Sequence, residues 1–185
     1  MDIPWNQAIR DDCADAFVTS IPYFTSNSGC VRYSWLRFLP RKNVPGFLGP
    51  LRDAIYQKLT SEPVLETFAG TMNTPASTIW VSPGPFLDEK GQPLTSFAST
   101  KTLYLSPKYQ AWAIGPVSSL GATALDIQGF LDHLDWFISR KPHHSRQKNE
   151  TWHVQLARAL LSSAMTDEQK SHMKRLNIIP LRTGD

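Results

Sequence analysis

A run of basic and imidazole side chains, without any acidic residue, lies between positions 140 and 148 of this chain. Cationic groups gathered in this way can neutralise phosphates, and the resulting affinity falls as salt is added. The pattern suggests a polyanion site for RNA or a phospholipid headgroup. It is also typical of a solvated loop between helices, which we favour because no nucleic-acid-binding fold signature accompanies it. The members of this basic cluster are Arg140, Lys141, His143, His144, Arg146 and Lys148.

A second group of residues has a spacing that could hold a metal ion. Glu150 and His153 lie three positions apart on one face of a predicted helix, a pair that occurs twice in di-iron helical bundles. This chain has a single copy, to which His133 could add a ligand, so a metal-dependent hydrolase is an alternative function. Ordinary polar residues on a helix surface explain the pair as well, and we predict no metal site.

The chain lacks the sequence patterns that accompany nucleotide binding and nucleophilic catalysis. It contains neither a GxxxxGK[ST] loop nor GxGxxG, and it has no GxSxG. Cys13 and Cys30 lie in apolar, helix-like segments, where a buried unreactive thiol is usual. The sequence leaves open whether these two cysteines pair. We therefore expect no catalytic residue, no cofactor and no enzymatic activity.

The composition is that of an ordinary globular protein. The 185 residues are 41% hydrophobic and carry a formal net charge of +3, which suits one domain over residues 1–185. The first residues include acids where a signal peptide needs a basic start, and no run of 18 apolar residues occurs. Two cysteines do not make a disulfide framework. These features predict an intracellular protein, cytoplasmic or nuclear, without a membrane span.

The periodicity predicts an α+β fold in which several helices cover a small mixed β-sheet. Residues 78–82 are the clearest strand, followed by a turn at 88–91 with Gly91 in the left-handed position. Further extended segments are predicted at 101–106 and, at a sheet edge, at 177–181. The predicted helices, with their capping residues, are 4–18 ended by Pro22, 31–39, 46–60, 127–140 capped by Asp126, 150–164 capped by Asn149, and a last one running from a Thr166–Gln169 capping box to Arg175.

Several stretches in order resemble a known arrangement. They are YSWLRFLP at 33–40, GQPL at 91–94, LYLSPKY at 103–109, LGATAL at 120–125 with the helix after it, WH at 152–153 leading to 156–161, and LNIIPL at 176–181. Their order is similar to the region downstream of the Hsp90-type ATPase domain in large sacsin-like and NO VEIN-like proteins, in particular their fungal relatives. The resemblance covers residues 5–181.

The departure from that family is as informative as the match. The family's nucleotide site needs an acidic helix with Glu and Asn, a DxGxG turn and a Gly-rich lid, and none of these occurs here. The resemblance therefore implies a non-catalytic accessory segment of a longer chaperone-like protein, which contacts a protein partner or other domains of the same polypeptide. We expect the contact surface to include exposed aromatic residues in loops, namely Phe86, Phe97 and Trp112.

Overall fold

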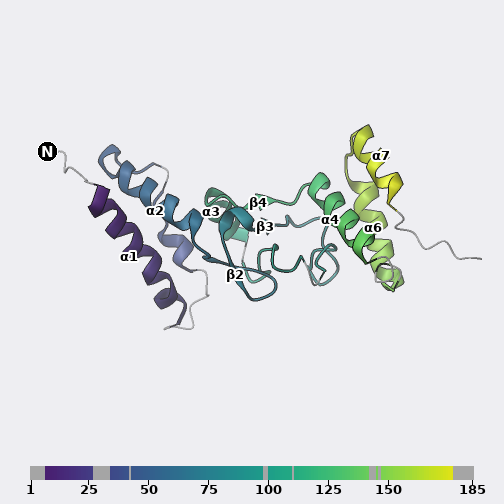
Figure 1. The fold of residues 1–185 in the computed structure, drawn as a ribbon, viewed down its shortest axis with the longest axis horizontal. Coiled ribbons are helices and arrows are strands. Elements are labelled where there is room, and N and C mark those ends of the chain that lie inside the picture. The colour runs from purple at the N-terminus through teal and green to yellow at the C-terminus, as the bar shows by residue number, and fades with distance from the viewer. Residues whose placement is uncertain are drawn as a thin grey trace, which may run out of the picture.

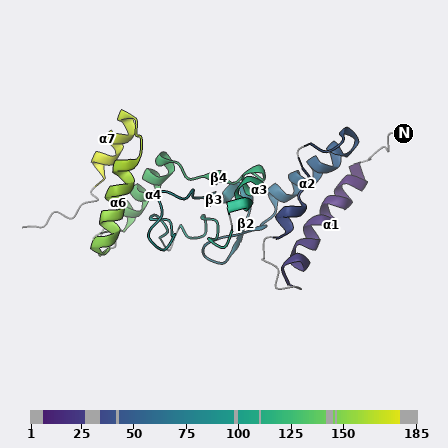
Figure 2. The same cartoon turned by 180° about the vertical axis from the view of Figure 1, so that it is seen from behind.

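A computed structural model describes residues 7–26, 34–41, 43–97, 100–109, 111–141, 145 and 147–176, with backbone alone at 22–26. It has the predicted mixed α+β architecture. In Figure 1 a small β-layer lies in the middle of an elongated molecule, with α1 and α2 at one end and α4, α6 and α7 at the other. The view from behind in Figure 2 shows the same order. Among the described residues, no helix combines the length and the apolar character needed to cross a bilayer.

The first end of the molecule is a helical pair. Helix α1 (Gln7–Ser26) packs along α2 (Gly49–Ser61), which follows the short 3-10 helices η1 (Ser34–Phe38) and η2 (Gly46–Leu48). The prediction for α2 is confirmed, with a proline in its first turn, where a missing N–H costs little.

Helix α1 differs from its prediction. It continues through Pro22, which was expected to end it. Its buried residues include Ala14 and Ile21, and the partly buried Phe17 packs against the same core, while Ile9 is 42% exposed. Packing along α2 outweighs the hydrogen bond that a proline removes.

The β-layer consists of two short ladders joined by single bridges. Strands β1 (Leu65–Glu66) and β2 (Met72–Asn73) pair antiparallel, and β3 (Ile79–Trp80) and β4 (Thr123–Ala124) pair parallel. The segment around Tyr104 and Leu105 bridges both ladders, parallel to Ile79 and antiparallel to Thr67. The predicted extended segment 101–106 therefore lies inside the layer, and the predicted strand 78–82 is reduced to two residues.

This layer separates two hydrophobic cores. Trp80 and Leu105 belong to the core shared with α1 and α2, whereas their neighbours Ile79 and Tyr104 belong to the core shared with α4 and α6. Successive side chains of an extended segment point to opposite faces, so β3 and the 104–105 segment each contribute to both cores.

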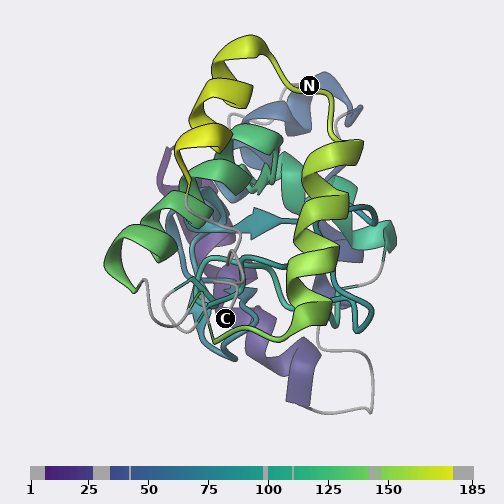
Figure 3. The same ribbon diagram turned by 90° about the vertical axis from the view of Figure 1, so that its right-hand side faces the viewer.

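The second end is formed by three capped helices. The caps predicted for α4 (Ile127–Arg140), α6 (Glu150–Ser162) and α7 (Asp167–Arg175) are confirmed, with the Asp126 and Asn149 side chains accepting backbone N–H groups and Thr166 forming a capping box. Figure 3 looks onto this end, where α6 and α7 lie in front of the sheet.

Two sequence predictions have other outcomes, and one helix is absent from the predictions. That helix is α3 (Ile114–Ser119), which has a proline in its first turn, where proline is tolerated. The helix predicted at 31–39 is the 3-10 helix η1 within its described part, and it buries Trp35 and Leu36. The strand predicted at 177–181 lies outside the described residues. The turn at 88–91 is confirmed, with Gly91 at φ +73°.

Candidate functional site

A pocket of about 220 Å³ lies against the β-layer and is lined by residues of both cores. Its walls are mostly rings and aliphatic groups. Three aromatic residues and three prolines contribute to it, together with aliphatic side chains from the residue after β3, the 87–93 turn region, the 104–105 segment and α3. The lining residues are Phe68, Trp80, Val81, Pro83, Leu87, Gly91, Pro93, Leu105, Ser106, Pro107, Tyr109 and Ile114.

The backbone holds the two largest rings of this pocket in place. Trp80 is fixed by its carbonyl, which accepts from Leu125 N at 2.8 Å, while the neighbouring Ile79 pairs with the 103–105 segment on the other side of β3. Tyr109 is 8% exposed, and its hydroxyl accepts from Glu66 N at 3.1 Å. The pocket walls are therefore attached to the sheet itself.

The indole of Trp80 carries a buried polar atom that the fold does not satisfy. Its Nε1 is inaccessible to solvent and finds no acceptor within the described part of the chain. Buried indole N–H groups usually have a partner, since leaving one without costs about 1–3 kcal/mol.

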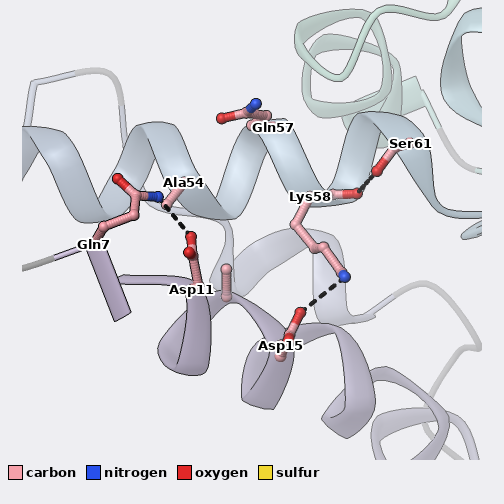
Figure 4. A pocket seen from close by; sticks show the side chains of 8 residues that line it. Gln7, Asp11, Asp15, Ala54, Gln57, Lys58 and Ser61 are labelled. Carbon is pink, nitrogen blue, oxygen red and sulfur yellow. Dashed lines mark hydrogen bonds and ion pairs between the residues drawn. The ribbon is translucent and has the colours of Figure 1, made fainter. Parts of the chain in front are cut away.

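A second hollow, of about 410 Å³, lies between α1 and α2 and is polar (Figure 4). Its charged groups satisfy one another. Lys58 Nζ lies 2.9 Å from Asp15 Oδ1, and Gln7 Nε2 donates to Asp11 Oδ1 at 2.7 Å. The hydrogen bond and the charge of Asp15 raise the pKa of Lys58. This hollow is thus a polar part of the contact between α1 and α2.

A third hollow, of about 490 Å³, lies between the 88–92 turn and the start of α6 and is lined in part by Lys148. The Lys148 ammonium lies 5.3 Å from the Phe97 ring centroid and 5.8 Å from that of Trp152. Burial, reinforced by the Lys101 ammonium, lowers the pKa of Lys148. The aliphatic part of the Lys148 side chain covers the core shared with α4 and α6, as long cationic side chains often do.

Inside the core shared with α4 and α6, a series of hydrogen bonds links a loop, the β-layer and α4. The fully buried Tyr104 hydroxyl lies 2.5 Å from Thr95 Oγ1 and 2.6 Å from His133 Nδ1. Burial raises the pKa of Tyr104 to about 12 and lowers that of His133, whose shift Asp132 partly opposes. The sequence analysis did not identify this group, because its members are far apart along the chain.

The structure divides the predicted basic cluster. Arg140 and Lys141 are exposed at the end of α4, where the Arg140 guanidinium lies 5.1 Å from the Trp136 ring centroid. Lys148 instead contacts aromatic rings of the core. His143, His144 and Arg146 lie outside the described residues. The three described members of the basic cluster therefore do not form one exposed cationic surface for a single ligand.

The residues considered for a metal site occupy separate environments. His133 Nδ1 is engaged by Tyr104, Glu150 is exposed, and the buried His153 Nε2 has no partner within the described ranges. No group of three or more metal-ligating side chains occurs among the residues that the structure describes. Cys13 is a half-buried free thiol, and Cys30 lies outside the described residues.

The three aromatic residues predicted as a partner surface have different positions. Phe97 is 5% exposed and stacks on Phe137, so it belongs to the core and the prediction for it is wrong. The Phe97 backbone N–H is held by Thr100 Oγ1 at 2.9 Å. Phe86 is half-buried against Phe130, and the half-buried Trp112 carries the Arg37 guanidinium 4.7 Å from its ring centroid.

The most exposed large apolar side chain among the described residues is Leu161 on α6, at 86%. Val154, seven residues earlier, is 42% exposed, and Ala157 between them is exposed as well. These three residues form an apolar stripe on the outer face of α6, which also carries the exposed Glu150 and Arg158. The apolar residues of α6 that do not belong to its buried stripe are the sequence signal for this face.

Comparisons of the chain with models of protein families, with curated proteins and with solved structures find no match.

Proposed function

We propose that this chain is a non-catalytic interaction module that contacts a protein partner or other domains of its own polypeptide through the outer face of α6. The observation that carries the proposal is the second apolar stripe of this helix, formed by Val154, Ala157 and Leu161.

An amphipathic surface helix is normally apolar on one face. The inward face of α6 is complete, because Trp152, Leu156, Ala159 and Leu160 are all buried. A helix that is apolar on two faces is typical of a helix covered on both sides. Clustered exposed apolar side chains commonly mark protein interfaces.

The resemblance to sacsin-like and NO VEIN-like proteins supports the same proposal. In that setting the module would accompany an Hsp90-type ATPase domain without taking part in hydrolysis. Polyanion binding has less support, because Lys148 is engaged with aromatic rings. The metal-dependent hydrolase has less support as well, because no described group of ligands surrounds Glu150 and His153.

Site-specific photo-crosslinking tests the proposal. A benzophenone amino acid is placed at position 161 of the natural polypeptide in its own cells, and a control is placed at Ser119, exposed at the end of α3. We expect crosslinks from position 161 to converge on one peptide surface that is absent from the control. Equal, scattered crosslinking from both positions would contradict the proposal.

A further inference from the structure

The side chain of Lys148 lines the hollow of about 490 Å³ between the 88–92 turn and the start of α6. This position is separate from the surface assigned to partner contact, because the apolar stripe of that surface belongs to residues 154–161 and Lys148 precedes the helix. A chemical role for Lys148 therefore goes beyond the proposed function and has its own test.

The two phenyl rings beside Lys148 do not hold its ammonium over a ring face. The rings of Phe97 and Phe137 are stacked, with centroids 3.5 Å apart and planes within 3° of parallel. The ammonium lies 5.3 Å from the first centroid and 6.0 Å from the second. An ion over the outer face of either ring would be much closer to that ring than to the other, so this ammonium lies beside the edge of the stacked pair. The edge of an aromatic ring is its positive side and does not attract a cation.

Among the described residues, little compensates the positive charge of Lys148. The Trp152 ring centroid, at 5.8 Å, is close to the limit of about 6 Å for attraction between a cation and a ring. Asp88 and Glu89 line the same hollow, but neither forms an ion pair with Lys148 within the described ranges. The Asp88 carboxylate instead accepts backbone N–H groups of its own turn.

A second lysine adds positive charge from the other side of Phe97. The Lys101 backbone N–H donates to the Phe97 carbonyl at 3.0 Å, and the Phe97 ring adjoins Lys148. Burial, and after it the charge of Lys101, lowers the pKa of Lys148. Lysine side chains that act as nucleophiles are commonly desolvated or placed beside another cation, because both conditions increase the share of free amine at neutral pH.

The hollow gives an electrophile access to this amine, because Lys148 forms part of its wall. We propose that Lys148 is a site of acylation by an activated acyl group of the thioester class. The neutral amine attacks the carbonyl carbon, so that a C–N bond forms and the C–S bond breaks. The thiolate leaves with the electron pair of the broken bond and takes up the proton that the amine nitrogen loses. The product is an uncharged amide, which ends the repulsion between Lys148 and Lys101.

The acylation rates of individual lysines in the folded chain test this. The probe is S-acetyl-N-acetylcysteamine at neutral pH, and mass spectrometry of the digested protein gives the rate at each lysine. Lys90 is the internal control, because it is exposed and lines the same hollow. We expect Lys148 to react at least about threefold faster than Lys90, because a larger share of it is unprotonated, and to lose this advantage in urea. A smaller advantage in the folded chain, or one that persists in urea, would overturn the proposal.

A matched pair of variants isolates the effect of the neighbouring charge. Lys101→Gln removes that charge, so more of Lys148 is protonated at neutral pH and its acylation should slow at least about twofold. Lys58→Gln, on α2 at the opposite end of the molecule in Figure 1, removes the same charge and should leave the Lys148 rate unchanged. An equal Lys148 rate in the two variants would overturn the part assigned to Lys101. The comparison of Lys148 with Lys90 uses the wild type, so it does not depend on a variant folding.

Discussion

The buried hydroxyl of Tyr104 shows what single residues contribute to this fold. It contacts both Thr95 and His133, so one oxygen joins a loop and a helix to the β-layer. A buried hydroxyl with partners stabilises modestly, whereas its removal leaves the partners unsatisfied. The same burial disfavours the phenolate and raises the pKa of Tyr104 to about 12.

The raised pKa predicts a loss of stability in alkaline solution. Tyr104 ionises near pH 10 in the unfolded chain and near pH 12 in the folded one. Between these pH values its hydroxyl therefore keeps its proton in the folded state and loses it in the unfolded state. Stability that is present below pH 10 should decline as pH rises toward 12, by roughly 3 kcal/mol at most.

Urea unfolding at pH 8, 10 and 11.5 measures this decline. Tyr104→Phe should be less stable at pH 8 by about 1–3 kcal/mol and should lose less on going to pH 11.5 than the wild type does. Burial also raises the pKa of Tyr56, but Tyr56 is present in both proteins. Its contribution to the pH dependence therefore cancels when the two profiles are subtracted. Parallel pH profiles of the two proteins would show that Tyr104 does not titrate as expected.

At the scale of elements, local signals predicted well what local interactions decide. The caps at Asp126, Asn149 and Thr166 involve residues at most three positions apart, so the sequence itself contains both partners. The turn at 88–91 was predictable for the same reason, because Asp88 and Gly91 form it between them.

Elements decided by distant contacts were predicted poorly. The passage of α1 through Pro22 depends on packing against α2, and the position of segment 101–106 inside the β-layer depends on its bridges to residues 67 and 79. The residues that line the candidate pocket come from positions 68 to 114, so no local spacing in the sequence predicts the pocket.

The cap of α4 gives a test at this scale. Asp126→Ala removes the acceptor that receives Gly129 N at 2.8 Å and should destabilise the protein by about 1 kcal/mol. Asp132→Ala, on the exposed face of the same helix, removes a single surface contact with Gln128 and should cost less than about 0.5 kcal/mol. Equal free energies of unfolding for the two variants, measured in urea, would contradict the assigned cap.

At the scale of the whole molecule, the thin β-layer connects two helical ends. Ile79 and Trp80 are neighbours in sequence, yet they belong to different cores. The sequence predicted a sheet covered by helices, but alternation over two residues is too short to show that the sheet has a core on each face. The outer face of α6 could be predicted only in part, because its exposure depends on what already covers the inner face.

The central claim is that this outer face is covered in the natural assembly. Leu161→Cys places a thiol on the face, and Ser119→Cys gives a matched exposed control on α3. The measurement is the rate of maleimide labelling at each position, located by mass spectrometry, in the separate chain and in the natural polypeptide in an extract of its own cells, where its partners are present. The account predicts that labelling at 161 slows at least tenfold in the natural polypeptide while labelling at 119 is unchanged. Equal rates at 161 in both settings would contradict it.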